Sequence, residues 1–398
     1  MRAPLLLSFL CAAGPVTAQQ PVTRADAVAR ALAAGARVTL ARADSAAAHG
    51  LTRAARQIEN PVLSASYSKS VPQYHATLDL ALDVPWLRSA RIGAAAWSER
   101  ATLYRYAGER AAARLDVEVA YTHALAAAAH ARLSARTARD ADSLLTMATI
   151  RRDAGDASDL DVALATVNAG EQKNAAADDS LAAVAALLDL QALMGQGSDT
   201  VTLALADTLA PPAPDSVAPP AGPTLAVAAA EADATAGARA VALERARLLG
   251  APSLEVGVEN RDPTGAETGI LPVIGLSFPI PLFNWNGGAV AAAAAERDRA
   301  RAALEVARRE SAADIARARR ERDAGLAKVA RDAELVASAE RVAAMSLTAY
   351  REGAIALPGV LEAQRNARDA LVRYVDDVAA LHDAADELRF FSATPETP

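Results

Sequence analysis

The pattern of apolar and polar positions occurs twice along the chain as the same series of elements. In each copy, a pair of short alternating segments precedes a very long helical stretch, a glycine turn and a returning helical stretch. The alternating pairs lie at 61–85 and 252–281, and the helical stretches lie at 88–149, 158–194, 289–351 and 357–390. The copies are offset by roughly 195 residues, which is too long for a solenoid repeat and indicates duplication of a whole structural unit.

The alternating segments predict strands that have one apolar and one wet face. Ala76, Leu78 and Leu80 fall on one side of a strand, and every second residue between them falls on the other side. The predicted wet faces carry four acids, namely Asp79, Asp83, Glu255 and Glu259. Each predicted strand has about 9 to 11 residues, which is the length that crosses a bilayer at a tilt.

Aromatic residues lie just past the ends of these strands. Trp86, Phe283 and Trp285 occupy the positions where membrane proteins carry interfacial aromatics. The same side chains also suit ordinary packing anchors, and the period alone also fits an antiparallel sheet on a soluble core. The aromatics favour the membrane interpretation without excluding the other.

The helical stretches are too long for a compact domain. Roughly 60 residues at a rise of 1.5 Å per residue give a helix of about 90 Å. That length suits a structure that spans a wide gap. A solvent-exposed coiled-coil rod is the alternative, but it explains the helices and leaves the strands unexplained.

The remaining segments define the domain boundaries. Residues 1–18 read as a secretory signal peptide, with Arg2 before a short apolar run and a cleavage site after Ala18. The first copy then covers 19–198, a Pro- and Ala-rich linker covers 199–222, the second copy covers 223–391, and 392–398 form a disordered tail. Cys11, the one cysteine, lies inside the signal, and its lipidation is an alternative to cleavage.

Composition and motifs argue against several functional classes. Hydrophobic residues make up 52% of the chain but aromatic residues only 4%, so alanine dominates, which suits thin and closely packed helices. The net charge of −7 argues against nucleic-acid binding. Nucleophile-elbow, phosphate-loop, dinucleotide and zinc-protease motifs are absent, and the five histidines are scattered. We expect no enzyme activity, no cofactor and no metal.

The turns into the returning helices carry a family resemblance. The first reads GDASDLDVALA from Gly155 to Ala165, and the second has Tyr350 and Gly353 followed by LPGVLEAQ. The strands end in VPWLRSARIG and IPLFNWNGG before the long helices. This ordered set, present twice, resembles the TolC-type outer-membrane efflux protein family over essentially the whole mature chain.

The resemblance implies a mainly α fold with a small membrane β part. Each of the two tandem repeats would contribute a β-hairpin and long antiparallel helices. Three copies would close a 12-stranded β-barrel in the outer membrane, continued by an α-helical barrel in the periplasm, because four strands cannot enclose a wide lumen. The positions that match the family's periplasmic constriction are Gly155, Asp161, Tyr350 and Gly353. Gly359 and Ile355 stand where an acid and a basic gating residue occur in the family, which argues against the usual salt-bridged lock.

The implied function is an outer-membrane channel of a tripartite efflux system. It would give passive exit to solutes that an inner-membrane pump of RND or ABC type drives through a periplasmic adaptor. The four wet-face acids would bias the exit toward cations. A type I secretion duct and a soluble periplasmic helical-hairpin protein remain alternatives, and the sequence leaves the substrate and the pump class open.

Overall fold

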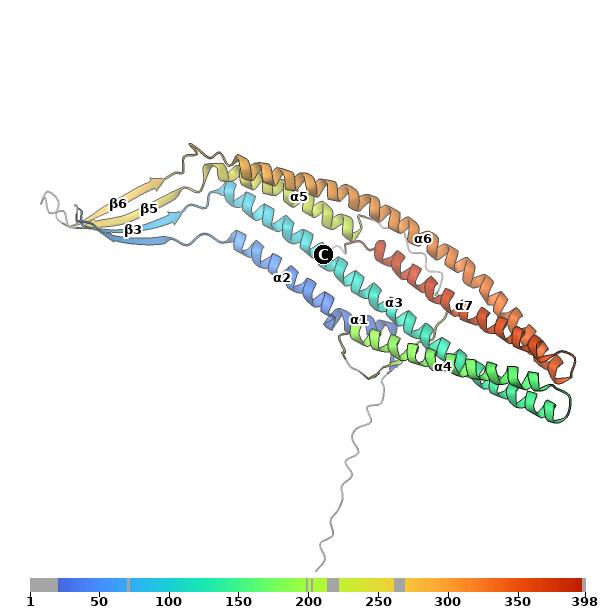
Figure 1. Cartoon of the computed structure of the whole chain (residues 1–398). Helices are drawn as coiled ribbons and strands as arrows, with labels where there is room; N and C mark the ends of the chain where they lie inside the picture. Colours follow the sequence, from blue (N-terminus) through green and yellow to red (C-terminus); the bar gives the residue numbers. More distant parts are fainter. Residues whose placement is uncertain are drawn as a thin grey trace, which may run out of the picture. The chain divides into compact units, whose positions relative to one another are not determined.

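The computed structural model describes residues 21–69, 72–197, 200–201, 203–212, 222–260 and 269–395, so the predicted signal peptide lies outside the described residues. The chain forms two compact units, which we describe separately (Figure 1). The strand unit comprises 32–115, 213–326 and 384–398, and the hairpin unit comprises 1–31, 116–212 and 327–383. Two long helices, α3 (Pro85–Asp153) and α6 (Gly287–Arg351), have residues in both units.

The strand unit contains a four-stranded antiparallel sheet. Its strands are β2 (Val62–Tyr67), β3 (Tyr74–Ala81), β5 (Ser253–Asn260) and β6 (Ile270–Ser277), in the order β2-β3-β5-β6. Leu78 lies opposite both Leu63 and Val256, whereas Asp79 lies opposite Glu255. The register therefore places Leu63, Leu78 and Val256 on one face and the acids on the other, as the alternation predicts. The acidic face also carries Val62, Leu271 and Val273.

The strands are shorter than predicted. β2 has 6 residues and the other three have 8 each, in place of 9 to 11. Past the end of β6 stand Pro279 and Pro281, which have no N–H to extend a ladder. A single further bond, from the amide of Leu82 to the carbonyl of Pro252, extends the pairing of β3 with β5.

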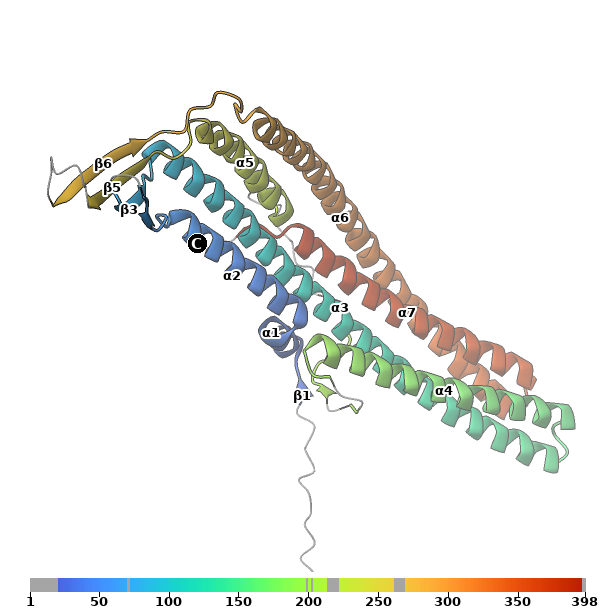
Figure 2. The same ribbon diagram turned by 60° about the vertical axis from the view of Figure 1, so that its left-hand side comes forward.

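Helices of the strand unit pack in pairs. Figures 1 and 2 show α2 (Ala36–Arg56) beside the first part of α3, and α5 (Leu225–Ala246) beside the first part of α6. The hydroxyl of Thr52 donates to the carbonyl of Ala95 at 3.3 Å between α2 and α3. A Cβ on Gly237 of α5 would lie 3.0 Å from the Cα of Arg297, so this glycine permits close approach to α6. A short 3-10 helix, Arg247–Leu249, ends α5.

The hairpin unit holds the returning helices, α4 (Asp159–Leu193) and α7 (Leu357–Phe391), as far as Asp383. Its N-terminal part is β1 (Pro21–Val22), which pairs in parallel with β4 (Ala204–Leu205), followed by α1 (Arg24–Ala34). The hydroxyl of Tyr121 donates to the carbonyl of Val22 and the carboxylate of Asp207, at 2.9 and 2.8 Å. Burial, followed by the bond with Asp207, raises the pKa of Tyr121 to about 12. This network anchors β1 in a core that includes Leu190 and Met194.

Two predicted boundaries need correction. The predicted linker 199–222 contains β4, because Leu203 and Leu205 pack on the core of the hairpin unit. The predicted disordered tail begins too early: the carbonyl of Ala393 accepts a bond from the amide of Leu225 at 2.9 Å. Residues 396–398 lie outside the described part of the chain.

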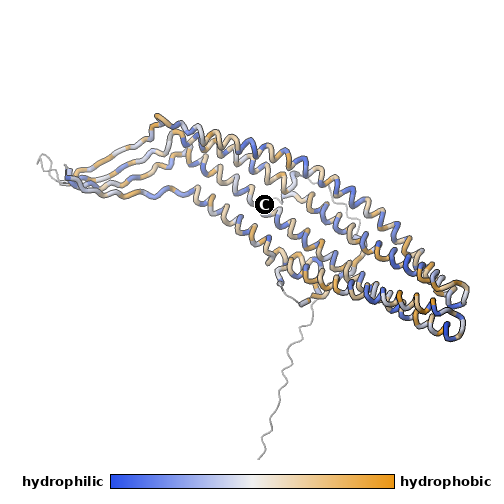
Figure 3. Tube along the Cα trace, viewed as in Figure 1, coloured by the Kyte–Doolittle hydropathy of each residue, from blue (hydrophilic) through white to orange (hydrophobic). Residues whose placement is uncertain are grey.

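Hydrophilic and hydrophobic residues alternate along the helices as well as the strands (Figure 3). None of the helices in the described ranges has a stretch that is long and apolar enough to cross a membrane.

Candidate functional site

The candidate site lies in the hairpin unit, where the two hairpin turns meet. Gly155 lies two residues past the end of α3 with φ +87°, and Gly353 lies two residues past the end of α6 with φ +76°. The two turns have the same hydrogen bonds: Asp156 N–H donates to the carbonyl of Arg151, and Ala354 N–H donates to that of Ala349, at 2.8 Å each. Both are Schellman turns, in which the left-handed position favours glycine. The structure thus gives both predicted turn glycines a conformational role.

Asp161 stabilises the start of α4. Its carboxylate accepts from the backbone N–H of Ser158 at 3.0 Å, and the Ser158 hydroxyl accepts from the N–H of Asp161 at 3.2 Å. These reciprocal bonds form a capping box at the first turn of α4. Asp161 therefore lies at the predicted tip, where it holds the turn geometry.

A small apolar core joins the two hairpins at their tips. Leu144 and Ala148 of α3 and Ala165 of α4 pack with three buried residues of α6 and α7, namely Tyr350, Leu357 and Val360. Ile355, which follows the second turn, packs against the same core.

Arg151 makes the polar contact between the tips. Its Nη1 donates to the carbonyl of Tyr350 at 2.5 Å, and its guanidinium carbon lies 4.7 Å from the centroid of the Tyr350 ring. Nη2 donates to the carbonyl of Asp156 at 3.3 Å in the turn of its own hairpin. One cation thus holds the last turn of α6 against the α3–α4 turn. We name this contact the Arg151 latch.

Tyr350 is the most enclosed of the predicted tip residues, with 3% of its surface exposed. Burial raises the pKa of its hydroxyl, opposed by the charge of Arg151 and reinforced by that of Asp161. The phenol therefore stays neutral at physiological pH. It acts through its ring and its backbone carbonyl.

Sequence reasoning missed Arg151. Arg151 and Arg152 are neighbours with the same chemistry, and spacing alone does not say which one reaches the other hairpin. In the structure Arg152 bonds to the adjacent Asp153 at 2.6 Å. The position of Arg151 in the sequence could have identified it. Arg151 precedes Gly155 by one helical turn, and the Schellman turn at Gly155 fixes the direction of the chain that follows.

Three of the four predicted wet-face acids lie on the polar face of the sheet. The Ser253 hydroxyl donates to Asp79 at 2.9 Å, and a ring nitrogen of His75 lies 3.1 Å from Glu259. Glu255 lies opposite Asp79 in the ladder. This face holds three carboxylates beside one imidazole.

Asp83 lies outside this group. It follows the end of β3, with its side chain 9% exposed, and pairs with Arg88 at 3.0 Å and Arg91 at 3.1 Å. Its charge is therefore compensated by the first turns of α3. The alternation defines the face of a residue only within a strand, and β3 ends at Ala81, before Asp83.

The predicted interfacial aromatics are all exposed. Trp86 lies in the first turn of α3, and Phe283 and Trp285 lie between β6 and α6. Phe283 is 98% exposed, which excludes a role as a packing anchor within the single chain. Figures 1 and 2 show the connection between β6 and α6 as a segment without helix or strand.

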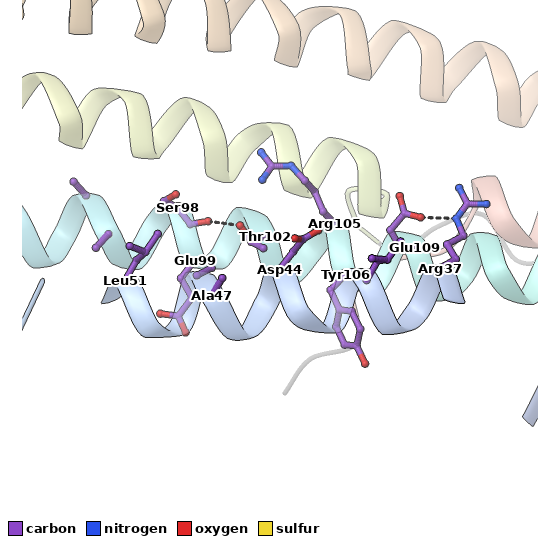
Figure 4. A pocket seen from close by; sticks show the side chains of 15 residues that line it. Arg37, Asp44, Ala47, Leu51, Ser98, Glu99, Thr102, Arg105, Tyr106 and Glu109 are labelled. Atoms are coloured by element: carbon purple, nitrogen blue, oxygen red, sulfur yellow. Dashed lines mark hydrogen bonds and ion pairs between the residues drawn. The ribbon is translucent and has the colours of Figure 1, made fainter. Parts of the chain in front are cut away.

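A groove of about 790 Å³ runs between α2 and α3 in the strand unit. Figure 4 shows the Arg37–Glu109 ion pair and Leu51 at opposite ends of it. Leu40 and Leu51 are each 70% exposed, and Asp44 lies between them along the helix. This face is apolar with a charged margin.

Metal ligation finds no support in the described ranges, where no three ligating side chains come together. His123 lies 2.9 Å from Asp383, and His130 lies 2.8 Å from Asp376, between α3 and α7. Each imidazole thus contacts a single carboxylate.

A family-level comparison matches residues 223–393 to the model described as outer membrane efflux protein. This range coincides with the second repeat. The comparison with curated proteins finds no match.

Solved structures share the fold of the whole chain. A membrane protein from Pseudomonas aeruginosa aligns with a TM-score of 0.78 at 18% identity, covering 97% of this chain and 99% of its own. The outer membrane protein VceC from Vibrio cholerae gives 0.76 at 16% identity, covering 93% and 96%. The Campylobacter jejuni CmeC outer membrane channel gives 0.76 at 15% identity, covering 93% and 85%.

Proposed function

We propose that three copies of this chain form a passive efflux duct, because residues 223–393 match the outer membrane efflux protein model and the whole chain shares the fold of solved outer-membrane proteins. The main supporting observation is the two-faced sheet, whose edge strands β2 and β6 each lack a neighbour on their outer side in the described chain. Each open edge needs a partner, and copies of the same chain supply it. The apolar faces then meet lipid and the polar faces meet water.

Our proposal includes no catalytic step and no energy source. A pump of the inner membrane drives the flux, and a periplasmic adaptor docks at the hairpin tips. The glycine turns and the Arg151 latch set the geometry of that docking surface. The substrate is selected by the pump.

The Arg151 latch closes the duct in this proposal. The tips of the two hairpins are held by one cation on a backbone carbonyl and by a small apolar core. Separating the hairpins breaks both and opens the mouth. In this proposal, the closed state needs no ion pair between acidic and basic side chains.

Asp79, Glu255 and Glu259 give the exit its charge bias. Three copies place nine carboxylates around one lumen, against three imidazoles, which raises the local concentration of cations. We propose a modest cation preference. Asp83 contributes little to it because two arginines compensate its charge.

Fractionation and native mass spectrometry test the proposal. The full chain should enter the outer-membrane fraction, require detergent for extraction, and give a mass three times that of the mature chain. Release with soluble periplasmic proteins as a monomer contradicts it, and favours the helical-hairpin alternative.

A further inference from the structure

The strand unit presents two faces that no other described part of the chain covers. On one side, Leu40 and Leu51 of α2 are each 70% exposed along the groove with α3. On the other, the first part of α6 exposes Val306 and a row of arginines. Along the chain, the edge strand β2 follows α2, and the edge strand β6 precedes α6.

The internal repeat relates these two faces. β3 and β6 correspond residue for residue, since Tyr74–Ala81 and Ile270–Ser277 precede Pro85 and Pro281 by the same distance. The burial pattern aligns the preceding helices in the same way. Buried Val38 and Thr52 of α2 have the spacing of buried Val227 and Val241 of α5. Equivalent positions are therefore defined on both helix pairs.

Within the chain, the first repeat meets the second through an ion pair. Arg105 of α3 pairs with Asp233 of α5, beside the pairing of β3 with β5. The side chains are 52% and 37% exposed, so this pair lies at the margin of the junction. This ion pair shows, within one chain, how the first repeat contacts the second.

Both partners have an equivalent on the uncovered faces. Arg301 follows Pro281 at the distance at which Arg105 follows Pro85. Asp44 follows Val38 at the distance at which Asp233 follows Val227. The side chain of Arg301 is 61% exposed and reaches Asp298 only at 3.9 Å, while Asp44 lines the groove of α2 and α3.

We propose that Arg301 of one copy pairs with Asp44 of the next, so that α6 lies against α2 as α3 lies against α5 within the chain. The partner of this surface is a second copy of the same chain, because the two halves of the contact repeat an internal one. A head-to-tail contact of this kind closes a ring when the rotation allows it. The inference rests on the proposed trimer and assigns its seam.

Charge reversal tests the pair in the full-length protein in detergent. Arg301→Glu and Asp44→Arg should each raise the dissociation constant of the trimer by about tenfold, because each places like charges at three seams. The double reversal should restore wild-type stability. Arg299→Glu, at a side chain 82% exposed on the same helix, is the matched control and should leave the trimer unchanged.

Cross-linking provides a second readout that does not depend on destabilisation. The one natural cysteine, Cys11, lies in the predicted signal, so introduced cysteines react alone in the mature chain. Arg301→Cys with Asp44→Cys and a short bis-maleimide should give covalent dimers and trimers, and neither single variant should.

The outcomes separate this inference from the proposed function. A wild-type trimer with neutral charge reversals and no cross-link overturns the Arg301–Asp44 seam and leaves the duct in place. A wild-type protein that stays monomeric overturns both. Restoration by the double reversal, together with the cross-link, supports the seam.

Discussion

Replacing Arg151 with methionine removes the latch between the hairpin tips while keeping an unbranched side chain. Arg151→Met deletes the donor to the Tyr350 carbonyl and the cation over its ring. A charged hydrogen bond contributes about 1.5 to 3 kcal/mol, and a partly exposed cation–π contact about 0.5 to 1 kcal/mol. Because Arg151 is only half-buried, we take the lower end, about 2 kcal/mol.

That magnitude predicts a large change in opening. At about 1.4 kcal/mol per tenfold, a loss of 2 kcal/mol shifts the equilibrium between closed and separated tips by about 30-fold. In planar bilayers, the fraction of time spent in the open state should rise by at least tenfold at unchanged unitary conductance. Arg151→Lys keeps the charge but loses the planar fork, so it should fall between wild type and Arg151→Met.

Arg152→Met is the matched control. Arg152 is the adjacent residue, is also half-buried, and pairs with Asp153 of its own helix. Its replacement should leave the open fraction at the wild-type value. Equal open fractions for both methionine variants, with normal trimer yield, would refute the latch.

Gly353→Val places a β-branched residue at φ +76° and should destabilise the second hairpin turn by about 1 to 2 kcal/mol. The variant should therefore bind the adaptor more weakly in a pull-down. Gly170→Val, in open space on α4, is the control and should bind the adaptor normally. Asp332→Asn should raise thermal stability at pH 7 and flatten the pH dependence of that stability. The hydrogen bond with Asp377, and then burial, raises the pKa of Asp332 above its usual 3.8. The stabilising contribution of the Asp332 carboxyl is therefore fully present below pH 3.8 and is lost as the pH rises through the raised pKa. Asp369→Asn, which replaces an exposed acid on α7, should change neither the thermal stability nor its pH dependence. Equal melting curves for the two variants would contradict the raised pKa of Asp332. Glu255→Gln with Glu259→Gln should lower the cation-to-anion permeability ratio measured from reversal potentials, whereas anion selectivity in the wild type would contradict the charge bias.

Elements with a strong period were predictable from the sequence. The two faces of the strands were predictable because a register slip of one residue would move every side chain to the opposite face of the sheet. The long helices were predictable from the alanine-rich stretches that lie before the glycine turns. The helix starts at Pro85 and Gly287 lie a few residues earlier than predicted, since proline is favoured in the first helical turn and Asn286 precedes the second. The predicted resemblance to outer-membrane efflux proteins is confirmed by the family match of the second repeat and by the shared fold.

The features that sequence reasoning missed depend on contacts between distant segments. Arg151 reaches Tyr350 across two hairpins, and no local pattern distinguishes it from Arg152. The alternation continues past Ala81 and so predicts a wet strand face for Asp83, but Arg88 and Arg91 of the following helix bind its carboxylate. The short strand β4 escaped prediction because two residues carry no period.

Single-channel recording of the full-length wild-type protein in planar bilayers tests the central claim most directly. If three copies enclose a water-filled lumen, the purified trimer should produce discrete conductance steps with a preference for cations. A detergent-stable trimer that inserts into the bilayer without conducting, both as the wild type and as Arg151→Met, or a monomer that never inserts, would contradict the account.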